Sequence, residues 1–342
     1  MRKRISLFAA IAALAGAAFA GAATAKRSDT ALVGAGSSLV APLISQWQQD
    51  YPAKTGVQLS YSPIGSGGGI AAITARTVDF GASDAPLTPD QLASCKGCVQ
   101  IPWALSATTL SYNVPGVPND LHLSGPVIAN IYLGHITRWN DPAIQKLNPK
   151  VKLPDLSITP AYRSDGSGDT YAFTDYLSRV SPEWKAKVGN STAVDFPTGV
   201  GGRGNAGVAG VVSRTQGAIG YISVAYTLAN RLAVAAVQNA SGHFATPGLR
   251  GIAAAAAAFK TVGPNNEMHI VNPPKSEKLA YPISTYTYVI LPTSSPKASE
   301  LRRFVFYGLT QGQRFGPKLI FARLPLPVLV AAERTLKQVQ AT

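Results

Sequence analysis

"YRSDGSGDTYAF" (residues 162–173) joins a strand-like segment to a helix-like segment through a Gly-Ser-Gly turn. The preceding SITPAYR is extended in character, and TYAFTDYLSRV has Tyr171, Phe173, Tyr176 and Leu177 suited to one face of an amphipathic helix. Free backbone N–H groups at the start of a helix attract anions, and Arg163 adds a cation. The stretch therefore predicts a strand, an anion-binding turn and a helix. Its two carboxylates, Asp165 and Asp169, are unexpected in such a turn.

Two more turns of the same chemical type occur nearer the N-terminus, at residues 34–38 and 65–69. Each lies between a strand-like and a helix-like segment, and a further strand-like run, VDFGASDAPL, contains Asp84. Strands that alternate with helices predict an α/β protein, in which ligands gather near helix N-termini. The chain contains no Walker A sequence, dinucleotide-binding fingerprint or fixed-period repeat. The three turns together therefore favour a small oxyanion over a nucleotide.

The N-terminus has the features of a secretory signal peptide. Three cations precede a short apolar run that ends in small residues, and we expect residues 1–25 to be removed after export. The apolar run is too short for a membrane anchor, and the absence of a Cys near the cleavage region argues against a lipid anchor. We therefore expect a periplasmic protein. The net charge of +14 falls to +11 without the leader, which indicates a mild anion-attracting field rather than a nucleic-acid site.

The only two cysteines are Cys95 and Cys98. In an oxidising compartment we expect them to form a disulfide. A redox-active pair needs its first Cys at a helix N-terminus after a strand, and a zinc site needs a second pair of ligands. The sequence around SCKGCVQ fits both alternatives poorly.

Hydrolytic catalysis is disfavoured by the motifs. None of Ser37, Ser66 and Ser167 lies in a G-x-S-x-G turn, and the four histidines show no pairing with a nucleophile. The chain also lacks the clustered His and Asp ligands of a metal-dependent phosphatase. We expect a binding protein without a cofactor or metal.

Several long motifs, in this order, carry a family resemblance. They are GAGSSLVAPLISQW, IGSGGGI, TVDFGASDAPL, RSDGSGDTYAFTDYL, NIYLGHITRWNDPAIQKLNP, GRGNAGV and GAIGYI. The chain resembles the PstS-type phosphate-binding proteins, the periplasmic receptors of the high-affinity phosphate ABC transporter, over nearly the whole mature length. The resemblance implies a type II periplasmic-binding-protein fold. It comprises lobe I (residues 29–108 and 280–342), lobe II (residues 109–279) and a two-strand hinge, with each lobe a mixed sheet flanked by helices.

The resemblance also implies a set of ligand residues for one inorganic phosphate. Ser38 and Ser66 match hydroxyl donors, Leu39 a backbone donor, Asp84 a carboxylate acceptor and Arg163 a bidentate cation. Ser167, Gly168 and Asp169 match the third turn, where many members have Thr in place of Asp169. The implied partners are the ligand and the transmembrane permease subunits, and we expect a monomer that does not bind nucleic acid.

The carboxylates of this set indicate which anion the site would select. A buried carboxylate at Asp84 can only accept hydrogen bonds, so it favours an anion that retains a proton; phosphate does so at neutral pH, whereas sulfate does not. Asp165 is expected to brace Arg163, or alternatively to shape the turn. Asp169 is either a first-turn carboxylate that suits the helix dipole or a second proton acceptor that favours the phosphate monoanion. An exported phosphatase, a receptor for another oxyanion such as sulfate or molybdate, and an adhesion or sensing role remain alternatives.

Overall fold

The computed structural model describes residues 31–342, so the predicted signal peptide lies outside the described residues. These residues form a mixed nine-stranded sheet, with helices around it, and a separate three-stranded sheet. The main sheet has the order β2-β1-β3-β12-β4-β8-β6-β7, and β9 also pairs with β4. The predicted α/β class and mixed sheets are confirmed.

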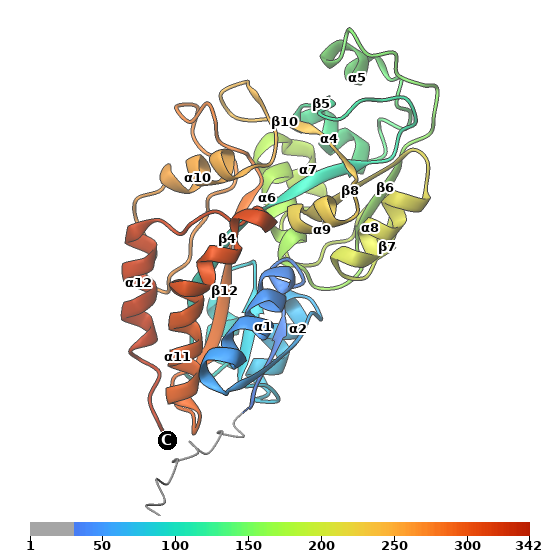
Figure 1. Ribbon diagram of the computed structural model, residues 1–342. Helices are drawn as coiled ribbons and strands as arrows, with labels where there is room; N and C mark the ends of the chain where they lie inside the picture. Colours follow the sequence, from blue (N-terminus) through green and yellow to red (C-terminus); the bar gives the residue numbers. More distant parts are fainter. Residues whose placement is uncertain (1–30) are drawn as a thin grey trace, which may run out of the picture.

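The half of the molecule that corresponds to lobe I contains both ends of the described chain, with α1, α2, α11 and α12 around its sheet (Figure 1). β1 pairs in parallel with β2 and β3, whereas β12 is antiparallel to β3 and β4. Its elements are β1 (Ala31–Gly36), α1 (Ala41–Thr55), β2 (Gln58–Ser62), α2 (Ser66–Thr74), β3 (Phe80–Ser83), α3 (Pro89–Ser94), β4 (Cys98–Tyr112), β12 (Ser284–Pro292), α11 (Ala298–Leu309), the 3-10 helices η1 (Gln311–Phe315) and η2 (Pro317–Leu319), and α12 (Leu326–Leu336).

The other half carries the remaining elements. β6 pairs in parallel with β7 and β8, and β8 is antiparallel to β4. Its elements are β5 (His122–Leu123), α4 (Gly125–Tyr132), α5 (Pro142–Leu147), β6 (Thr159–Arg163), α6 (Gly168–Val180), α7 (Pro182–Lys187), β7 (Val200–Gly202), α8 (Gly204–Arg214), β8 (Ala218–Ser223), α9 (Val224–Ala229), β9 (Ala233–Val234), β10 (Ala236–Gln238), β11 (Phe244–Ala245) and α10 (Leu249–Ala257). β11, β10 and β5 form the three-stranded sheet.

The long strand β4 runs through both halves. Its residues up to Ala107 pair with β12, and from Thr108 onward they pair with β8. The N–H of Thr108 still donates to the carbonyl of Ile283, so the chain leading into β12 lies beside β4 where the partner changes. Two neighbouring segments thus connect the halves, as expected of a two-strand hinge.

The lobe boundaries predicted at 108/109 and 279/280 can be compared with the contacts between the segments. The first coincides with the change of partner along β4. Near the second, Gln100 donates to the carbonyl of Asn265, and the N–H of Met268 donates to the Tyr288 hydroxyl. Residues 265–268 therefore already contact lobe I strands, and the precise extent of each lobe stays a prediction.

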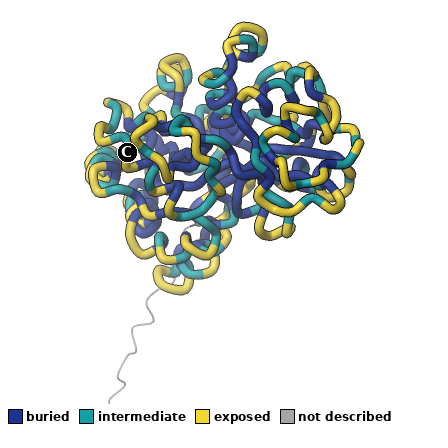
Figure 2. The backbone as a smooth tube through the Cα atoms, turned by 90° about the horizontal axis from the view of Figure 1, so that it is seen from above, coloured by how far each residue is buried: buried dark blue, intermediate teal, exposed yellow. Residues whose placement is uncertain are grey.

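The helices next to the predicted turns form because their apolar residues can be buried on one face. In α1, the residues Leu43, Ile44, Trp47 and Tyr51 are buried, as the sequence spacing predicts. In α6, Phe173, Tyr176 and Leu177 are buried, while Tyr171 is half-buried. Full burial of such a side chain contributes about 1.5–3 kcal/mol, which anchors each helix firmly on its sheet. Figure 2 shows buried backbone through the middle of both halves and exposed turns at the periphery.

Cys95 and Cys98 form a disulfide between the end of α3 and the start of β4. Cys95 lies at the C-cap of α3, rather than at the helix N-terminus that lowers the pKa of a redox-active thiol. Between Ala31 and Thr342, none of the helices has both the length and the apolar character needed to cross a membrane.

Candidate functional site

The helix starts that follow the Gly/Ser turns meet where the two halves touch. The N–H of Gly168 at the start of α6 donates to the Ser66 hydroxyl at the start of α2, at 3.1 Å. The N–H of Asn205, in the first turn of α8, lies 3.3 Å from the Ser38 hydroxyl, which precedes α1. Four helix N-termini therefore converge on one place, which makes it favourable for negative charge.

Glycine is required in these turns because the two halves approach closely. The N–H of Gly67 donates to the carbonyl of Gly166 at 3.0 Å, so the two Gly-rich runs are in direct contact. A side chain at Gly168 would overlap with Asp84. Gly65 has a φ of +88°, and a side chain there would overlap with Asp165. Steric approach thus explains these glycines, in addition to the anion-binding role inferred from the sequence.

Asp84 lies directly after β3 and is buried among hydroxyl donors. Ser37 Oγ lies 2.6 and 2.7 Å from its two oxygens, Thr287 Oγ1 lies 3.0 Å away and Ser66 Oγ 3.3 Å away. Burial raises the pKa of Asp84 to about 7, and the charge of Asp169 acts in the same direction. Since a carboxylate has about four acceptor positions and these hydroxyls supply three protons, one position remains for a further donor.

Arg163 ends β6 and is the buried cation of the site. Its Nε and Nη2 donate to the two oxygens of Asp165 at 2.7 and 2.5 Å, a forked pair that fixes the guanidinium plane. Asp165 also accepts from the N–H of Gly204 at 2.9 Å. Burial acts to raise the pKa of Asp165, but the hydrogen bonds and charge of Arg163 outweigh it and the pKa is lowered. Asp165 is therefore a charged partner of Arg163.

Asp169 is fully buried in the first turn of α6, in contact with Arg163. Its Oδ2 accepts from Arg163 Nη1 at 3.2 Å and from Asn205 Nδ2 at 2.7 Å, and its Oδ1 accepts from Thr108 Oγ1 at 2.7 Å. Burial raises the pKa of Asp169, although Arg163 and the hydrogen bonds from Thr108 and Asn205 oppose this. The first-turn location suits the helix dipole, while the raised pKa and one remaining acceptor position suit proton recognition.

The structure brings the predicted ligand residues to this interlobe site, most of them with other partners. The N–H of Leu39 donates to Ser37 Oγ at 3.0 Å, and Ser167 Oγ caps α6 by accepting from the N–H of Thr170. Sequence reasoning missed four side chains that contact the site carboxylates: Ser37, Thr108, Asn205 and Thr287. Asn205 lies in the quoted GRGNAGV motif and Ser37 in GAGSSL, but nothing local distinguishes the two threonines in their extended segments.

The side chains of the four histidines have partners other than the residues of this site. His135 pairs with Glu183, and His122 stacks on Phe244 with ring centroids 4.0 Å apart. Over residues 31–342, no group of three or more His, Cys, Asp or Glu side chains is arranged to hold a metal ion.

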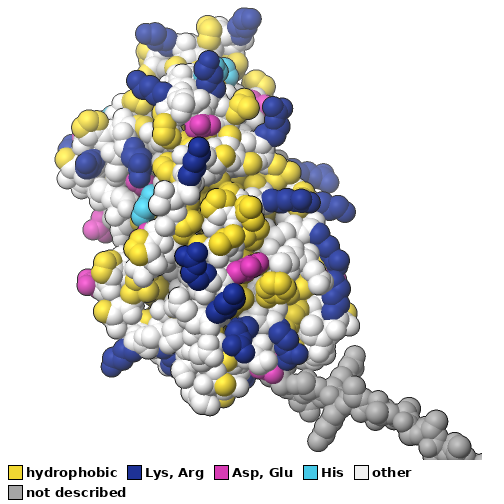
Figure 3. All heavy atoms as spheres, turned by 90° about the vertical axis from the view of Figure 1, so that its left-hand side faces the viewer, with side chains coloured by type: hydrophobic (Ala, Val, Ile, Leu, Met, Phe, Trp, Pro, Cys, Tyr) yellow, Lys and Arg dark blue, Asp and Glu magenta, His cyan; other side chains and the backbone are white. Residues whose placement is uncertain are grey.

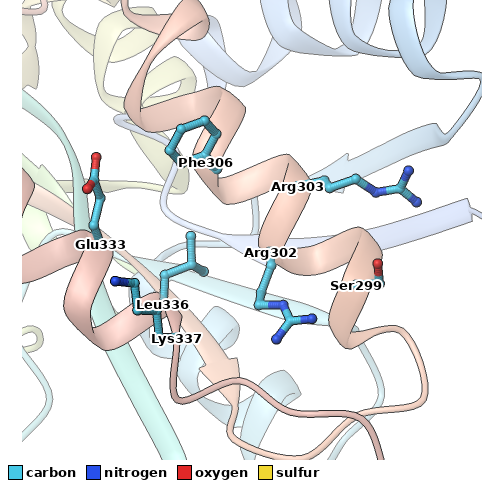
Figure 4. Close-up of a pocket in the computed structure, with 7 residues that line it drawn as sticks. All are labelled: Ser299, Arg302, Arg303, Phe306, Glu333, Leu336 and Lys337. Carbon is cyan, nitrogen blue, oxygen red and sulfur yellow. The ribbon is translucent and has the colours of Figure 1, made fainter.

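A groove of about 460 Å³ lies elsewhere, between α11 and α12 (Figure 4). Phe306, half exposed, contributes to its lining, and hydrophobic atoms bordered by Lys and Arg are visible on the face of the molecule seen in Figure 3. Its cations lie at the surface, where Arg303 pairs with Glu300 and Arg302 donates to a backbone carbonyl. Buried charge, which marks a site built for an ion, occurs instead at the interlobe site.

Comparisons with known proteins agree with this geometry. Residues 20–308 match the model of the PBP superfamily domain. A relative from Xylella fastidiosa (strain Temecula1), named phosphate-binding protein PstS, is 41% identical over 90% of this chain and 83% of its own length. A relative of the same name from Pasteurella multocida (strain Pm70) is 39% identical over 87% of both chains.

A solved structure, the phosphate-binding protein from Stenotrophomonas maltophilia, shares the fold. It superposes with a TM-score of 0.71 at 19% identity and covers 89% of this chain and 93% of its own. Family model, sequence relatives and fold thus agree over most of the chain, and the protein belongs to the PBP superfamily and, within it, to the family of PstS phosphate-binding proteins.

Proposed function

We propose that this protein binds one inorganic phosphate between its two lobes and delivers it to an ABC-type phosphate permease. The observation that carries the proposal is the environment of Asp84. When ionised, this buried carboxylate holds hydroxyl donors from its own half and retains one acceptor position beside the buried Arg163. Such an acceptor rewards a ligand that is anionic and still protonated.

The proposed ligand groups are the predicted ones: Ser38, Leu39, Ser66, Asp84, Arg163, Ser167, Gly168 and Asp169. Two of their backbone donors now bond within the protein, since Leu39 N–H binds Ser37 and Gly168 N–H binds Ser66. On binding, these donors would exchange their present acceptors for phosphate oxygens. The exchange conserves hydrogen bonds, so the transfer of phosphate from water costs little in unpaired polar groups.

The transport role brings further proposals. The protein acts after export, in the periplasm, as a monomer that docks on transmembrane permease subunits and catalyses no reaction. The names of the relatives support a role in phosphate binding. A phosphatase on the same scaffold would instead turn over a phosphomonoester, and a sulfate or molybdate receptor would have no use for the acceptor at Asp84.

Isothermal titration of the mature protein with phosphate, sulfate and arsenate at pH 6 and pH 8 tests the proposal. We expect tight one-to-one phosphate binding and no heat from sulfate. A protein that gives neither heat nor a thermal shift with phosphate does not have the proposed function. Release of phosphate from a phosphomonoester at a rate above that of an Asp84→Asn control would support the enzyme instead.

Asp169→Thr tests whether this carboxylate reads a second ligand proton. If Asp169 accepts a hydrogen bond from a second ligand proton, the wild-type affinity for phosphate falls about tenfold between pH 6 and pH 8, because phosphate in solution loses that proton over this range. The threonine introduced in the variant donates a hydroxyl and needs no extra proton, so we expect the affinity of the variant to change by less than about threefold. Calorimetry at three pH values measures this.

Asp175→Asn, in the same helix and paired with the exposed Arg179, is the control and should keep the wild-type profile. An Asp169→Thr protein with an unchanged pH profile would show that Asp169 serves α6 and Arg163 only.

Asp165→Asn tests the bracing of Arg163. The amide oxygen can still accept from Arg163 or Gly204, and Asp169 remains as a counter-charge, so we expect phosphate affinity to fall by no more than about tenfold. Calorimetry at pH 7 measures the change, and Asp155→Asn, which loses a comparable partner of the exposed Arg138, should have no effect. A loss of about a thousandfold would make Asp165 an essential part of the anion site.

A further inference from the structure

Both polar atoms of the Asn205 side chain form hydrogen bonds where the two lobes meet. It is fully buried, and its Nδ2 donates to Ser38 Oγ at 3.0 Å and to Asp169 Oδ2 at 2.7 Å. Its Oδ1 accepts from the N–H of Ser223 at 2.7 Å, which anchors α8 to the end of β8. This one amide therefore links Ser38 of lobe I to Asp169 and Ser223 of lobe II.

The contact determines how Ser38 can bind a ligand. A hydroxyl has two acceptor positions and one proton. Both the backbone N–H and the Nδ2 of Asn205 point to Ser38 Oγ, at 3.3 and 3.0 Å, so its acceptor positions are occupied. Ser38 therefore has only its hydroxyl proton available, and it can donate this proton to a bound anion.

The same contact exists only when the lobes touch. Ser38 and Asn205 lie 167 residues apart on opposite sides of the hinge, so separation of the lobes breaks both hydrogen bonds. Two further bonds between the Gly/Ser turns of the two lobes, from Gly67 to Gly166 and from Gly168 to Ser66, have backbone N–H donors. The Nδ2 of Asn205 is therefore a donor of this contact that a substitution can remove without changing a glycine, while the bond from its backbone N–H remains.

We propose that Asn205 is a positioning residue that holds the lobes closed over the bound anion, by fixing Ser38 as a donor and tying it to Asp169. The inference rests on the proposed phosphate function. It assigns to the GRGNAGV motif a role in retaining the ligand, separate from direct contact with it.

Asn205→Ala tests the proposal through the rates of binding. Loss of the side-chain bond to Ser38 raises the dissociation rate of radiolabelled inorganic phosphate about 10- to 100-fold, because Ser38 has this buried partner only in the closed state. The association rate should change by less than about threefold, since the open lobes meet phosphate without Asn205. Small-angle scattering at saturating phosphate should show a less compact variant.

Asn239→Ala is the matched control. Asn239 is also a buried amide, with Nδ2 donating to the carbonyls of Lys278 and Ala280, but it lies away from the site. We expect it to lower the melting temperature and leave both rates unchanged. If Asn205→Ala only lowers the ligand-free melting temperature and releases phosphate at the wild-type rate, the proposal is wrong.

A double-mutant cycle with Ser38→Ala separates the routes of action. Asn205→Ala raises the dissociation rate of phosphate by a certain factor in the wild type. If Asn205 acts through Ser38, this factor should be several times smaller in the Ser38→Ala background. A full, independent effect in that background would overturn the Ser38 route. A wild-type protein that does not bind phosphate would refute the proposed function itself, which distinguishes the two failures.

Discussion

Asp84→Asn is expected to abolish most of the discrimination between phosphate and sulfate. The amide can turn its NH₂ toward a fully deprotonated oxygen, so a ligand without protons no longer meets an unpaired lone pair. Sites that require a ligand hydrogen reject analogues by about 10⁴, and we expect the phosphate-to-sulfate affinity ratio to fall by about 100-fold or more. Competitive calorimetry at pH 7 gives both affinities.

The ligand-free Asp84→Asn protein provides an internal control. Because the folded-state pKa of Asp84 is raised from 3.8 to about 7, the folded protein keeps a proton that the unfolded chain loses. The free energy of unfolding of the wild type should therefore fall by a few kcal/mol as pH rises from about 4 to 7, and the variant should lack this part of the decline. A variant that loses the pH dependence of stability yet still rejects sulfate would show that the Asp84 carboxylate is not the cause of the selectivity.

Arg163→Met is expected to reduce phosphate affinity by roughly 10³-fold at pH 8. Arg163 donates to Asp165 and Asp169, and its removal leaves Asp169 and Asp84 buried without their cation, in front of an anionic ligand. Truncation of one member of a buried charge pair costs about 2–5 kcal/mol, which corresponds to this range. At pH 5.5 the loss should be smaller, since Asp84, whose pKa burial raises to about 7, is then protonated.

Two variants control this experiment. Arg163→Lys keeps the charge and loses the fork, so it should bind with intermediate affinity. Arg138→Met breaks an exposed pair with Asp155 and should bind like the wild type. Equal affinity of Arg163→Met and the wild type at pH 8 would exclude Arg163 from the anion site.

Local sequence patterns were sufficient for the elements that carry the site. The helices α1 and α6 follow from apolar spacing, and the turns before them from Gly and Ser at helix starts. The pairing of Arg163 with Asp165 was also predictable, because residues two apart at the end of a strand point to the same side. Family membership followed from long motifs in a fixed order, which no single property such as charge could have indicated.

Only the tertiary structure decided how strongly the carboxylates hold protons. The partners that matter are remote in sequence: Thr287 lies 203 residues from Asp84, and Thr108 lies 61 residues from Asp169. Their hydroxyls reach the site through strand register along β4 and β12, which local spacing does not encode. The contact of Asn205 with Ser38 depends in addition on how the lobes meet.

The sequence by itself therefore determined the α/β segments, the Gly/Ser turns at the helix starts and the family of this protein. The proton affinity of Asp84 and Asp169, and the closing contact of Asn205, were decided by the tertiary structure. The physical reason is that burial and hydrogen bonds from distant strands set a pKa, whereas helix starts and turns depend on neighbouring residues alone. Asp165 and Asp169 illustrate this, since their hydrogen-bond partners include Arg163, Thr108 and Asn205.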